Sequence, residues 1–291
     1  MKQKLNLIKC FQYYFDDILN NIEHKKYYYT DCESYMKLYV NDMNSRDMST
    51  SMQIYWKEIL LRVHFTATIS IIRNQRWLSG VISGIENKNF MIFSSALRGF
   101  LESVTDSFYS LEEFTTALPL NYKNINKAVR GELNELMSTE KLENDLLHFQ
   151  MAKKSKENMF ILKALPATKY IEYFDKFNST KTKELYSQLC EITHPASRSI
   201  TCFTEEIVVS DSYSYLQTTL INDSNQIEKI FDDYLSSIES LLKISLTIPF
   251  LILKILLKYD FDEVKSEYIE RCAANELLRE SFEKVLKLFN T

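Results

Sequence analysis

Apolar side chains recur every three to four residues along most of the chain, the spacing of amphipathic α-helices. The pattern predicts a first helix over residues 2–29 and a shorter one over residues 34–43, with Thr30 or Asp31 able to cap the second. It continues through the second half of the chain in segments of helical length. There the expected helices cover residues 125–137, 140–153, 168–177, 181–193, 226–259 and 262–289.

The most apolar stretch of the first half predicts one long helix over residues 52–86, preceded by Ser49, Thr50 and Ser51 as candidate caps. A second helix over residues 90–111 follows after a short polar turn. We expect the two helices to form a central antiparallel hairpin. Gly80 and Gly84 lie four residues apart near the turn and would let the second helix approach closely.

Prolines and capping residues predict several of the boundaries. Pro119 and the Asn-rich residues after it indicate a loop. Ser179 or Thr180 can cap the helix over residues 181–193, which Pro195 ends because a proline disfavours helical geometry at the residue before it. Pro249 is expected to interrupt the helix over residues 226–259, and a break is expected near Ala273.

β-branched and aromatic residues are concentrated in one region, residues 205–220. Two runs, at residues 207–209 and 213–220, flank the turn-like residues 210–212. This arrangement is typical of a small β-hairpin, although irregular chain covering the core is an alternative.

Glycine and proline are scarce, with only 4 of each in 291 residues, where average usage is about 7% and 5%. Turns with positive φ and phosphate-binding loops need glycine, so Gly-rich nucleotide sites, propellers and turn-rich sandwiches are disfavoured. The prediction is an all-α protein, a multi-helix bundle with a small β element. We expect one helical domain over residues 1–291, with residues 260–291 as a loosely attached part.

Charge and cysteine content set further bounds. The net charge of −4 offers no bulk attraction to nucleic acid. The 5 cysteines are scattered and lack C-x-x-C spacing, which favours buried thiols in a reducing cytoplasm over disulfides or a zinc site. The N-terminal residues lack the apolar stretch of a signal peptide. We expect a cytoplasmic protein without a metal or other cofactor.

Residues 241–257 form an apolar run close to the length of a membrane span. Lys243 and Lys254 lie inside it, and each charge costs roughly 2.5–3.5 kcal/mol near the centre of a bilayer. The prediction is therefore a buried core helix or a subunit interface, with membrane contact as the disfavoured alternative.

Common active-site motifs are absent: there is no G-x-S-x-G, Walker loop, G-x-G-x-x-G, H-E-x-x-H or EF-hand loop. Of the 4 histidines, His24 lies among charged residues and is expected on the surface, His64 is expected to be a hydrogen-bonded core residue, and nothing distinguishes His148. His194 is the exception, because it follows a helix whose dipole would favour an imidazolium. Glu191 lies one turn earlier and can share its face. Capping of the helix is the structural alternative for His194.

The second candidate group is on the helix over residues 90–111. Arg98, Glu102 and Asp106 recur every four residues and therefore lie on one helix face. They can form an intrahelical ladder of ion pairs. The alternative is functional: Arg98 and Glu102 would meet His194 in one polar pocket between helices.

A basic aromatic cluster lies in the long helix. Arg73, Arg76 and Trp77 could bind a nucleobase or phosphate there, or they could simply form the polar face near the helix end. Arg73, Arg76 and Arg198 are the candidate phosphate-binding residues. Tyrosine is abundant, including three in a row at residues 27–29, and is favoured at protein interfaces.

Two of these segments resemble a known family. The sequence Leu-Arg-Gly-Phe-Leu-Glu at residues 97–102, with Tyr-Ser-Gln-Leu-Cys-Glu-Ile-Thr-His-Pro-Ala-Ser at residues 186–197, resembles a group of helical bacterial proteins. That group is similar to abortive-infection proteins and to the HEPN superfamily of helical ribonucleases and nucleotide-binding proteins. HEPN ribonucleases carry Arg-x4–6-His on one helix and act as dimers. No arginine precedes His194 at that distance, so Arg98 from another helix would have to replace it.

Three functions are carried forward. The resemblance implies a HEPN-like protein of antiviral defence or toxin type that acts on RNA or a nucleotide, with His194 as general acid or base and Arg98 and Glu102 beside it. The second is a non-enzymatic interaction subunit that binds another protein or a second copy. The third is a membrane-associated helical protein.

Overall fold

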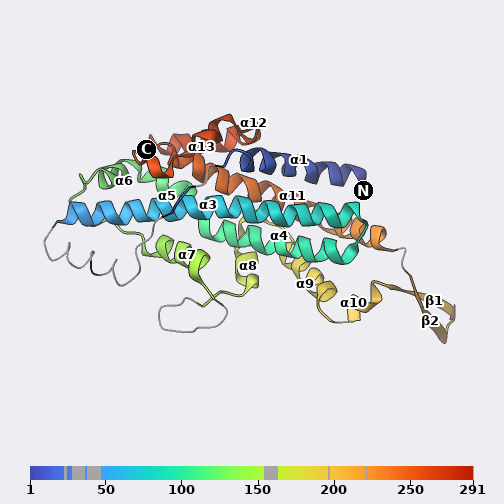
Figure 1. Cartoon of the computed structure of the whole chain (residues 1–291). Coiled ribbons are helices and arrows are strands. Elements are labelled where there is room, and N and C mark those ends of the chain that lie inside the picture. The colour runs from blue at the N-terminus through green and yellow to red at the C-terminus, as the bar shows by residue number, and fades with distance from the viewer. Residues whose placement is uncertain are drawn as a thin grey trace. The chain divides into compact units, whose positions relative to one another are not determined.

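The computed structural model describes residues 1–22, 25–27, 37, 47–153, 163–195, 197–219 and 222–290. These residues are mostly helical (Figure 1), and the sheet among them has two strands. The prediction of an all-α bundle with a small β element is confirmed. Apart from Lys37, the helix predicted over residues 34–43 lies outside the described residues, as do Thr30, Asp31, Cys32 and His24.

The contacts of the chain group into two compact units. Unit 1 comprises Met1–Tyr13, Arg73–Asp106 and Pro166–Ile244, and unit 2 comprises Tyr14–Ile72, Ser107–Leu165 and Ser245–Thr291. Both units receive residues from α1 (Lys2–Leu19), α3 (Met48–Glu86), α4 (Phe90–Leu111) and α11 (Asp223–Leu256). The C-terminal residues expected to be loosely attached belong to unit 2.

In unit 1 the C-terminal part of α3 and most of α4 form the predicted antiparallel hairpin (Figure 1). Close approach is possible because the facing positions on α3 have no side chain: a Cβ on Gly84 would lie 2.5 Å from the backbone nitrogen of Phe93, and one on Gly80 would lie 3.0 Å from the Cβ of Ala96. The role predicted for both glycines is confirmed. Phe93 then packs on Phe231 of α11, with ring centroids 5.6 Å apart.

Helices α8 (Ala167–Asn178), α9 (Thr182–Thr193) and α10 (Ser197–Thr201) complete the helical part of unit 1. The cap of α9 differs from the prediction of Ser179 or Thr180. The carboxylate of Asp175, from the end of α8, accepts hydrogen bonds from the backbone nitrogens of Thr182 (3.1 Å) and Lys183 (2.9 Å). The other end of α9 is as predicted, since it stops at Thr193, two residues before Pro195.

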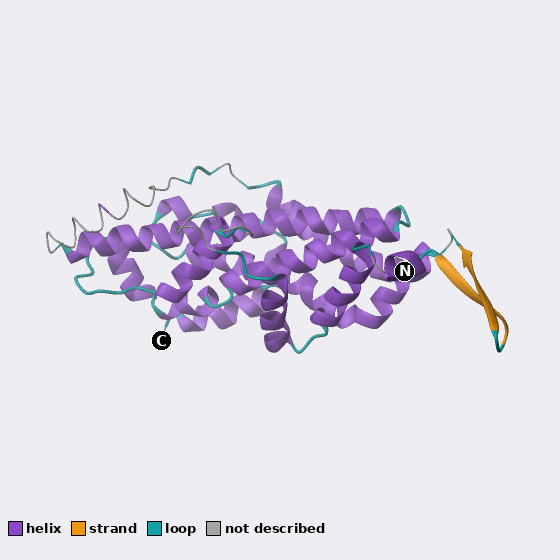
Figure 2. Cartoon of the chain, turned by 90° about the horizontal axis from the view of Figure 1, so that it is seen from below, coloured by secondary structure: helices purple, strands orange, loops and turns teal. Residues whose placement is uncertain are grey.

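The β element of unit 1 is a hairpin of β1 (Thr204–Ser210) and β2 (Tyr213–Thr218). The strands are antiparallel, with Ile207 opposite Tyr215 and a register shift between Val208 and Ser210. Figure 2 shows that the hairpin projects away from the neighbouring helices. Every residue of β2 is exposed, so the hairpin does not contribute to the hydrophobic core.

Unit 2 is built from shorter helices around the first part of α3 and the last part of α11. They are α5 (Phe114–Leu120), α6 (Tyr122–Val129), α7 (Glu140–Met151), α12 (Ala274–Leu277) and α13 (Arg279–Leu288), with single 3-10 turns at Asp262–Val264 and Glu267–Arg271. The core contains large buried side chains, among them Trp56 and Tyr259. The Tyr259 hydroxyl donates a hydrogen bond to the Leu118 carbonyl (2.8 Å), so its polar atom is satisfied.

The apolar run of α11 lies largely in this core. Leu246, Phe250 and Leu253 are fully buried within unit 2. The Lys254 ammonium donates to the Asn275 Oδ1 (2.6 Å) and lies 4.1 Å from the centroid of the Phe282 ring. Among the described helices, none combines the length and the apolar character that crossing a bilayer requires. The run is therefore a core segment of the fold.

Several predicted boundaries are wrong. Helix α1 ends at Leu19 rather than at residue 29. Just after this end, the Asn21 side chain donates a hydrogen bond to the Asp17 carbonyl (2.7 Å). Helix α3 begins at Met48, because Asp47 accepts a hydrogen bond from the Thr50 backbone nitrogen (3.2 Å) and replaces the predicted serine and threonine caps.

Three further corrections concern prolines and helix ends. Pro119 lies inside α5 and not in a loop, and the helix predicted to run to residue 137 ends at Val129. Helix α11 continues through Pro249, while its non-helical backbone geometry falls at Tyr234. The C-terminal region consists of several short 3-10 turns and helices, and the predicted break near Ala273 falls just before α12.

Candidate functional site

The end of α9 and the middle of α4 meet at the Arg98 guanidinium. Its Nη1 lies 3.1 Å from the His194 Nε2 and donates to the Thr193 Oγ1 at 3.1 Å. Its Nε donates to the Glu102 Oε1 at 3.1 Å. Arg98, Glu102 and His194 therefore share one polar cluster, as the alternative reading of the sequence expected, and we call them with Thr193 and Tyr186 the Arg98 cluster.

The aromatic member of the Arg98 cluster is Tyr186, about two helical turns before Thr193 on α9. Its ring lies 5.7 Å from the Arg98 guanidinium carbon, within the range of a cation–π contact. Burial, a hydrogen bond with Cys190 and the nearby Glu102 carboxylate raise the pKa of Tyr186 to about 12. The raised pKa favours the protonated phenol, whose hydrogen bond is made with Cys190 on the same helix.

Protonation states in the Arg98 cluster follow from its hydrogen bonds. Burial acts to lower the pKa of Arg98, but the hydrogen bond to Glu102 and the neighbouring Cys190, Glu102 and Tyr186 outweigh it, so the pKa is raised. A guanidinium has donors only, so its bond to the His194 Nε2 requires a lone pair there. The contact is therefore a hydrogen bond only for the imidazole tautomer with its proton on Nδ1.

The Arg98 cluster is open to solvent. His194 is exposed, and the Arg98 and Glu102 side chains are 25% and 37% accessible. An oxyanion can thus reach the guanidinium and replace the imidazole as the acceptor of Nη1. Arginine binds phosphate and carboxylate well, because its donors match two oxygens at once. What the arrangement can do chemically is hold an anion next to a neutral histidine.

The sequence interpretation missed two members of the Arg98 cluster, Tyr186 and Thr193, and the neighbouring Cys190. They recur at spacings of four and three residues and so lie on one face of α9 that leads to His194. The spacing was a usable signal. None of the three residues carries a charge, whereas Glu191 on the same helix does and was the residue singled out beside His194.

Two acidic residues expected near Arg98 and His194 are engaged elsewhere in unit 1. The Asp106 Oδ2 accepts from the Arg73 Nη2 at 2.6 Å, which links α4 to α3. The Glu191 Oε2 lies 3.4 Å from the Arg198 Nη1. The predicted ladder on α4 therefore stops at Glu102, and Asp106 stabilises the helix hairpin instead.

The predicted phosphate-binding residues fall in separate environments. Arg73 donates to the Ser103 hydroxyl (2.9 Å) and to Asp106, so it serves as an interhelical contact. Arg198 donates to the Gln188 Oε1 (3.1 Å) and to Glu191. Arg76 is exposed. The neighbouring Trp77 ring lies over Gly99, where a Cβ would come within 2.6 Å of the indole. Phosphate binding by these arginines stays a prediction.

His64 is a buried, hydrogen-bonded residue of unit 2, as predicted. It is 2% exposed, with the Tyr27 hydroxyl 2.7 Å from Nδ1 and the Ser266 hydroxyl 2.7 Å from Nε2. Burial, and then the charge of Lys25, lower the pKa of His64 to about 3. His148, which no sequence feature distinguished, is half-buried and accepts a hydrogen bond from the Leu165 backbone nitrogen (3.1 Å) through Nε2.

Stability is expected to fall as His64 becomes protonated in the unfolded state. The unfolded imidazole titrates near 6.5 and the folded one near 3. Between these values the unfolded state binds more protons than the folded state. The free energy of unfolding therefore decreases as the pH is lowered, by at most about 1.4 kcal/mol per pH unit.

Urea unfolding at several pH values between about 7 and 4 measures this loss. The His64→Gln variant is the control, because glutamine can still hydrogen-bond and does not titrate. Its stability should be lower at neutral pH and should depend less on pH. Parallel pH profiles for the two proteins would contradict the assignment.

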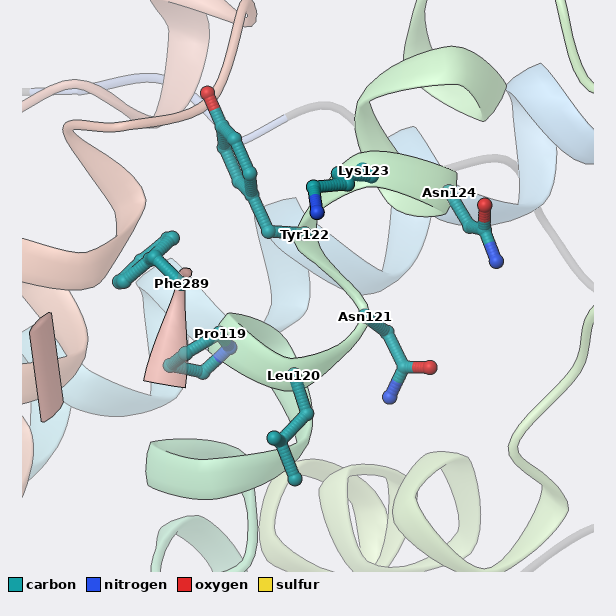
Figure 3. Close-up of a pocket in the computed structure, with 7 residues that line it drawn as sticks. All are labelled: Pro119, Leu120, Asn121, Tyr122, Lys123, Asn124 and Phe289. Carbon is teal, nitrogen blue, oxygen red and sulfur yellow. The ribbon is translucent and has the colours of Figure 1, made fainter. Parts of the chain in front are cut away.

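A pocket of about 140 Å³ lies in unit 2 (Figure 3). It is smaller than the roughly 300–1,000 Å³ usual for ligand sites. Its lining lacks histidine, cysteine, aspartate and glutamate, and Tyr122 stacks edge-on with Phe289 at a centroid distance of 5.1 Å. The lining consists of Pro119, Leu120, Asn121, Tyr122, Lys123, Asn124 and Phe289. Without an acid or base pair, this pocket is not the candidate active site.

Among the described residues, no group of three or more histidine, cysteine or acidic side chains could hold a metal ion. Of the described cysteines, Cys202 and Cys272 are buried, Cys190 is intermediate and Cys10 is exposed, and all four are free thiols.

Comparison of the chain with protein-family models, with curated proteins and with solved structures finds no match. The resemblance to abortive-infection and HEPN proteins accordingly stays a prediction. The functional argument has to be made from the Arg98 cluster itself.

Proposed function

We propose that this chain is a cytoplasmic, HEPN-like protein of bacterial antiviral defence or toxin type that cleaves phosphodiester bonds in RNA. The Arg98 cluster would be its active site. Arg98 would bind the phosphate, His194 would move the proton, and Glu102 would orient the guanidinium through its 3.1 Å bond to Nε.

One observation carries the proposal. The Arg98 Nη1 and the Nε2 of the exposed His194 are 3.1 Å apart although they come from different helices. HEPN ribonucleases place such a pair on one helix, and the sequence lacks an arginine at that spacing. The contact between Arg98 and His194 supports the proposal, because an arginine and a histidine in contact could act on the same phosphate.

The chemistry follows from exchange of one hydrogen-bond acceptor. A phosphate oxygen that binds the Arg98 guanidinium displaces the His194 Nε2, which then has a free lone pair. That lone pair can take the proton from a ribose 2′-hydroxyl, whose oxygen attacks phosphorus. The bond to the 5′-oxygen breaks, the His194 imidazolium returns its proton to this oxygen through a water molecule, and the products are a 2′,3′-cyclic phosphate, a 5′-hydroxyl and neutral His194.

We expect purified wild-type protein to cleave labelled single-stranded RNA and to leave the all-deoxy strand of the same sequence intact. His194→Ala should reduce the rate by about 100-fold or more, the usual contribution of a general acid or base. Cleavage is followed on gels, and the cyclic phosphate is identified by mass spectrometry.

Arg130→Ala is the matched control. Arg130 is an exposed arginine of unit 2 with ion pairs to Glu132 and Asp260. The Arg130→Ala variant should cleave RNA like the wild type. Circular dichroism should show that all variants are folded. An inactive wild type that also leaves host growth and total RNA unchanged on expression would overturn the proposal, as would a fully active, folded His194→Ala protein.

A second candidate function, a non-enzymatic interaction subunit, is favoured by a different observation. The β-hairpin exposes large apolar side chains, with Val208 71% and Leu216 65% accessible. Exposed apolar clusters of this kind mark binding surfaces. This function does not need the Arg98 cluster to be catalytic.

A further inference from the structure

The β1–β2 hairpin is a sheet with two open edges. Two-stranded hairpins are marginally stable in water on their own, and an open edge presents unpaired backbone donors and acceptors to other chains. The hairpin projects from the helices in both views (Figures 1 and 2), and the bond from the Thr219 nitrogen to the Phe203 carbonyl (2.9 Å) closes its base.

The two edges differ in how they are protected. Strand β1 carries Glu205 and Glu206 and has the register irregularity between Val208 and Ser210. Charged residues and bulges are the devices that block pairing at an edge. Strand β2, with the sequence Tyr-Ser-Tyr-Leu-Gln-Thr, has no charge, proline or bulge. The edge of β2 is therefore the one open to pairing.

Apolar side chains flank this edge on both faces of the hairpin. Tyr215 lies opposite Ile207 on one face, and Leu216 lies opposite Glu206 on the other. Tyr213, Tyr215 and Leu216 are 60%, 44% and 65% exposed. An added strand would cover part of this surface on each side, because cross-strand neighbours contact each other.

We propose that β2 pairs with β2 of a second copy of this chain. The pairing would be antiparallel about a two-fold axis and would give a four-stranded sheet in the order β1–β2–β2′–β1′. An uncharged strand meets no like charge in such a symmetric arrangement, and the same residues serve both partners, as a two-fold interface requires.

Charge selects this arrangement over the other symmetric one. Pairing through β1 would place Glu205 and Glu206 of both copies on adjacent strands, roughly 5 Å apart, where like charges repel. Pairing through β2 separates the two β1 strands by three strand spacings, about 14 Å, beyond the screening length of about 8–10 Å at physiological salt. The acidic, irregular β1 strands then become the outer edges and stop further addition, so the assembly closes as a dimer.

The test uses the full-length chain and the mass of the particle in solution. Sedimentation velocity and light scattering of the wild type should show a concentration-dependent dimer. Leu216→Lys places a charge on the pairing strand and should weaken dimerisation at least tenfold. Val208→Lys is the matched control: Val208 is similarly exposed (71% against 65% for Leu216) but lies on β1, so this variant should dimerise like the wild type.

A second variant, in which a short Gly-Ser turn replaces residues 205–217, removes the hairpin altogether. It tests the proposal even if the lysine at position 216 disrupts the hairpin. It should be monomeric and keep the helical circular dichroism of the wild type. A wild type that stays monomeric up to about 100 µM would overturn the proposal, as would equal dimerisation of the wild type and the hairpin replacement. None of these readouts depends on RNA cleavage.

Discussion

Replacing Gly84 with alanine is expected to lower the free energy of unfolding by about 2 kcal/mol. In an ordinary helix interior, alanine is more favourable than glycine by about 1 kcal/mol. At this position the new Cβ would lie 2.5 Å from the backbone nitrogen and 2.6 Å from the Cα of Phe93. Backbone atoms of α4 cannot move away without separating the two helices, and such overpacking costs about 3 kcal/mol.

Gly80→Ala is the graded comparison for this prediction. Its Cβ would lie 3.0 Å from a single side-chain atom, the Cβ of Ala96. A shift of a few tenths of an ångström relieves that contact, so the gain in helix propensity should offset most of the cost. Urea unfolding of the three proteins provides the measurement. If Gly84→Ala were as stable as the wild type, the close approach of α3 and α4 would be wrong.

The second large effect concerns the coupling of Arg98 and His194. If both act on the same phosphate, Arg98→Ala and His194→Ala should each reduce RNA cleavage by about 100-fold, and the double variant should be little worse than either. The reason is that neither residue completes the reaction alone: Arg98 without His194 lacks the base, and His194 without Arg98 lacks the bound phosphate. Independent sites would give the product of the two losses.

The measurement is a double-mutant cycle on kcat/KM with single-turnover rates. Arg98→Lys separates charge from geometry: it keeps the positive charge but not the fork of donors that contacts Thr193, His194 and Glu102. We expect it to recover little activity. Losses that multiply in the double variant would show that the two residues do not share one substrate group.

Helix identity was predictable from the sequence where the apolar spacing was long and regular, as in α4, whose observed bounds Phe90–Leu111 match the prediction. The errors fall at boundaries set by tertiary contacts. Asp175 caps α9 from the preceding helix, which local capping rules applied to Ser179 and Thr180 cannot reveal. Asp47 precedes three hydroxyl residues that were equally plausible caps, and the choice depends on side-chain geometry.

The candidate site was predictable only in part. The contact between Arg98, Glu102 and His194 was one of two alternatives, because Arg98 and Glu102 share one face of α4 and could also have formed only an intrahelical ladder. The pairing of Arg73 with Asp106 and of Arg198 with Glu191 was not expected, because it depends on which faces of neighbouring helices meet. Helix periodicity defines the faces of one helix and leaves their partners open.

The positions of the two tryptophans make each unit separately visible by fluorescence. Trp56 is 2% exposed in unit 2, where its indole nitrogen donates to the Met137 carbonyl (3.1 Å). Trp77 is 42% exposed in unit 1 and lies over Gly99, the residue after Arg98. Their emission should therefore differ in wavelength. Single-tryptophan versions of the chain would report whether the two units unfold together, and the Trp77 signal would also sense an anion that binds Arg98.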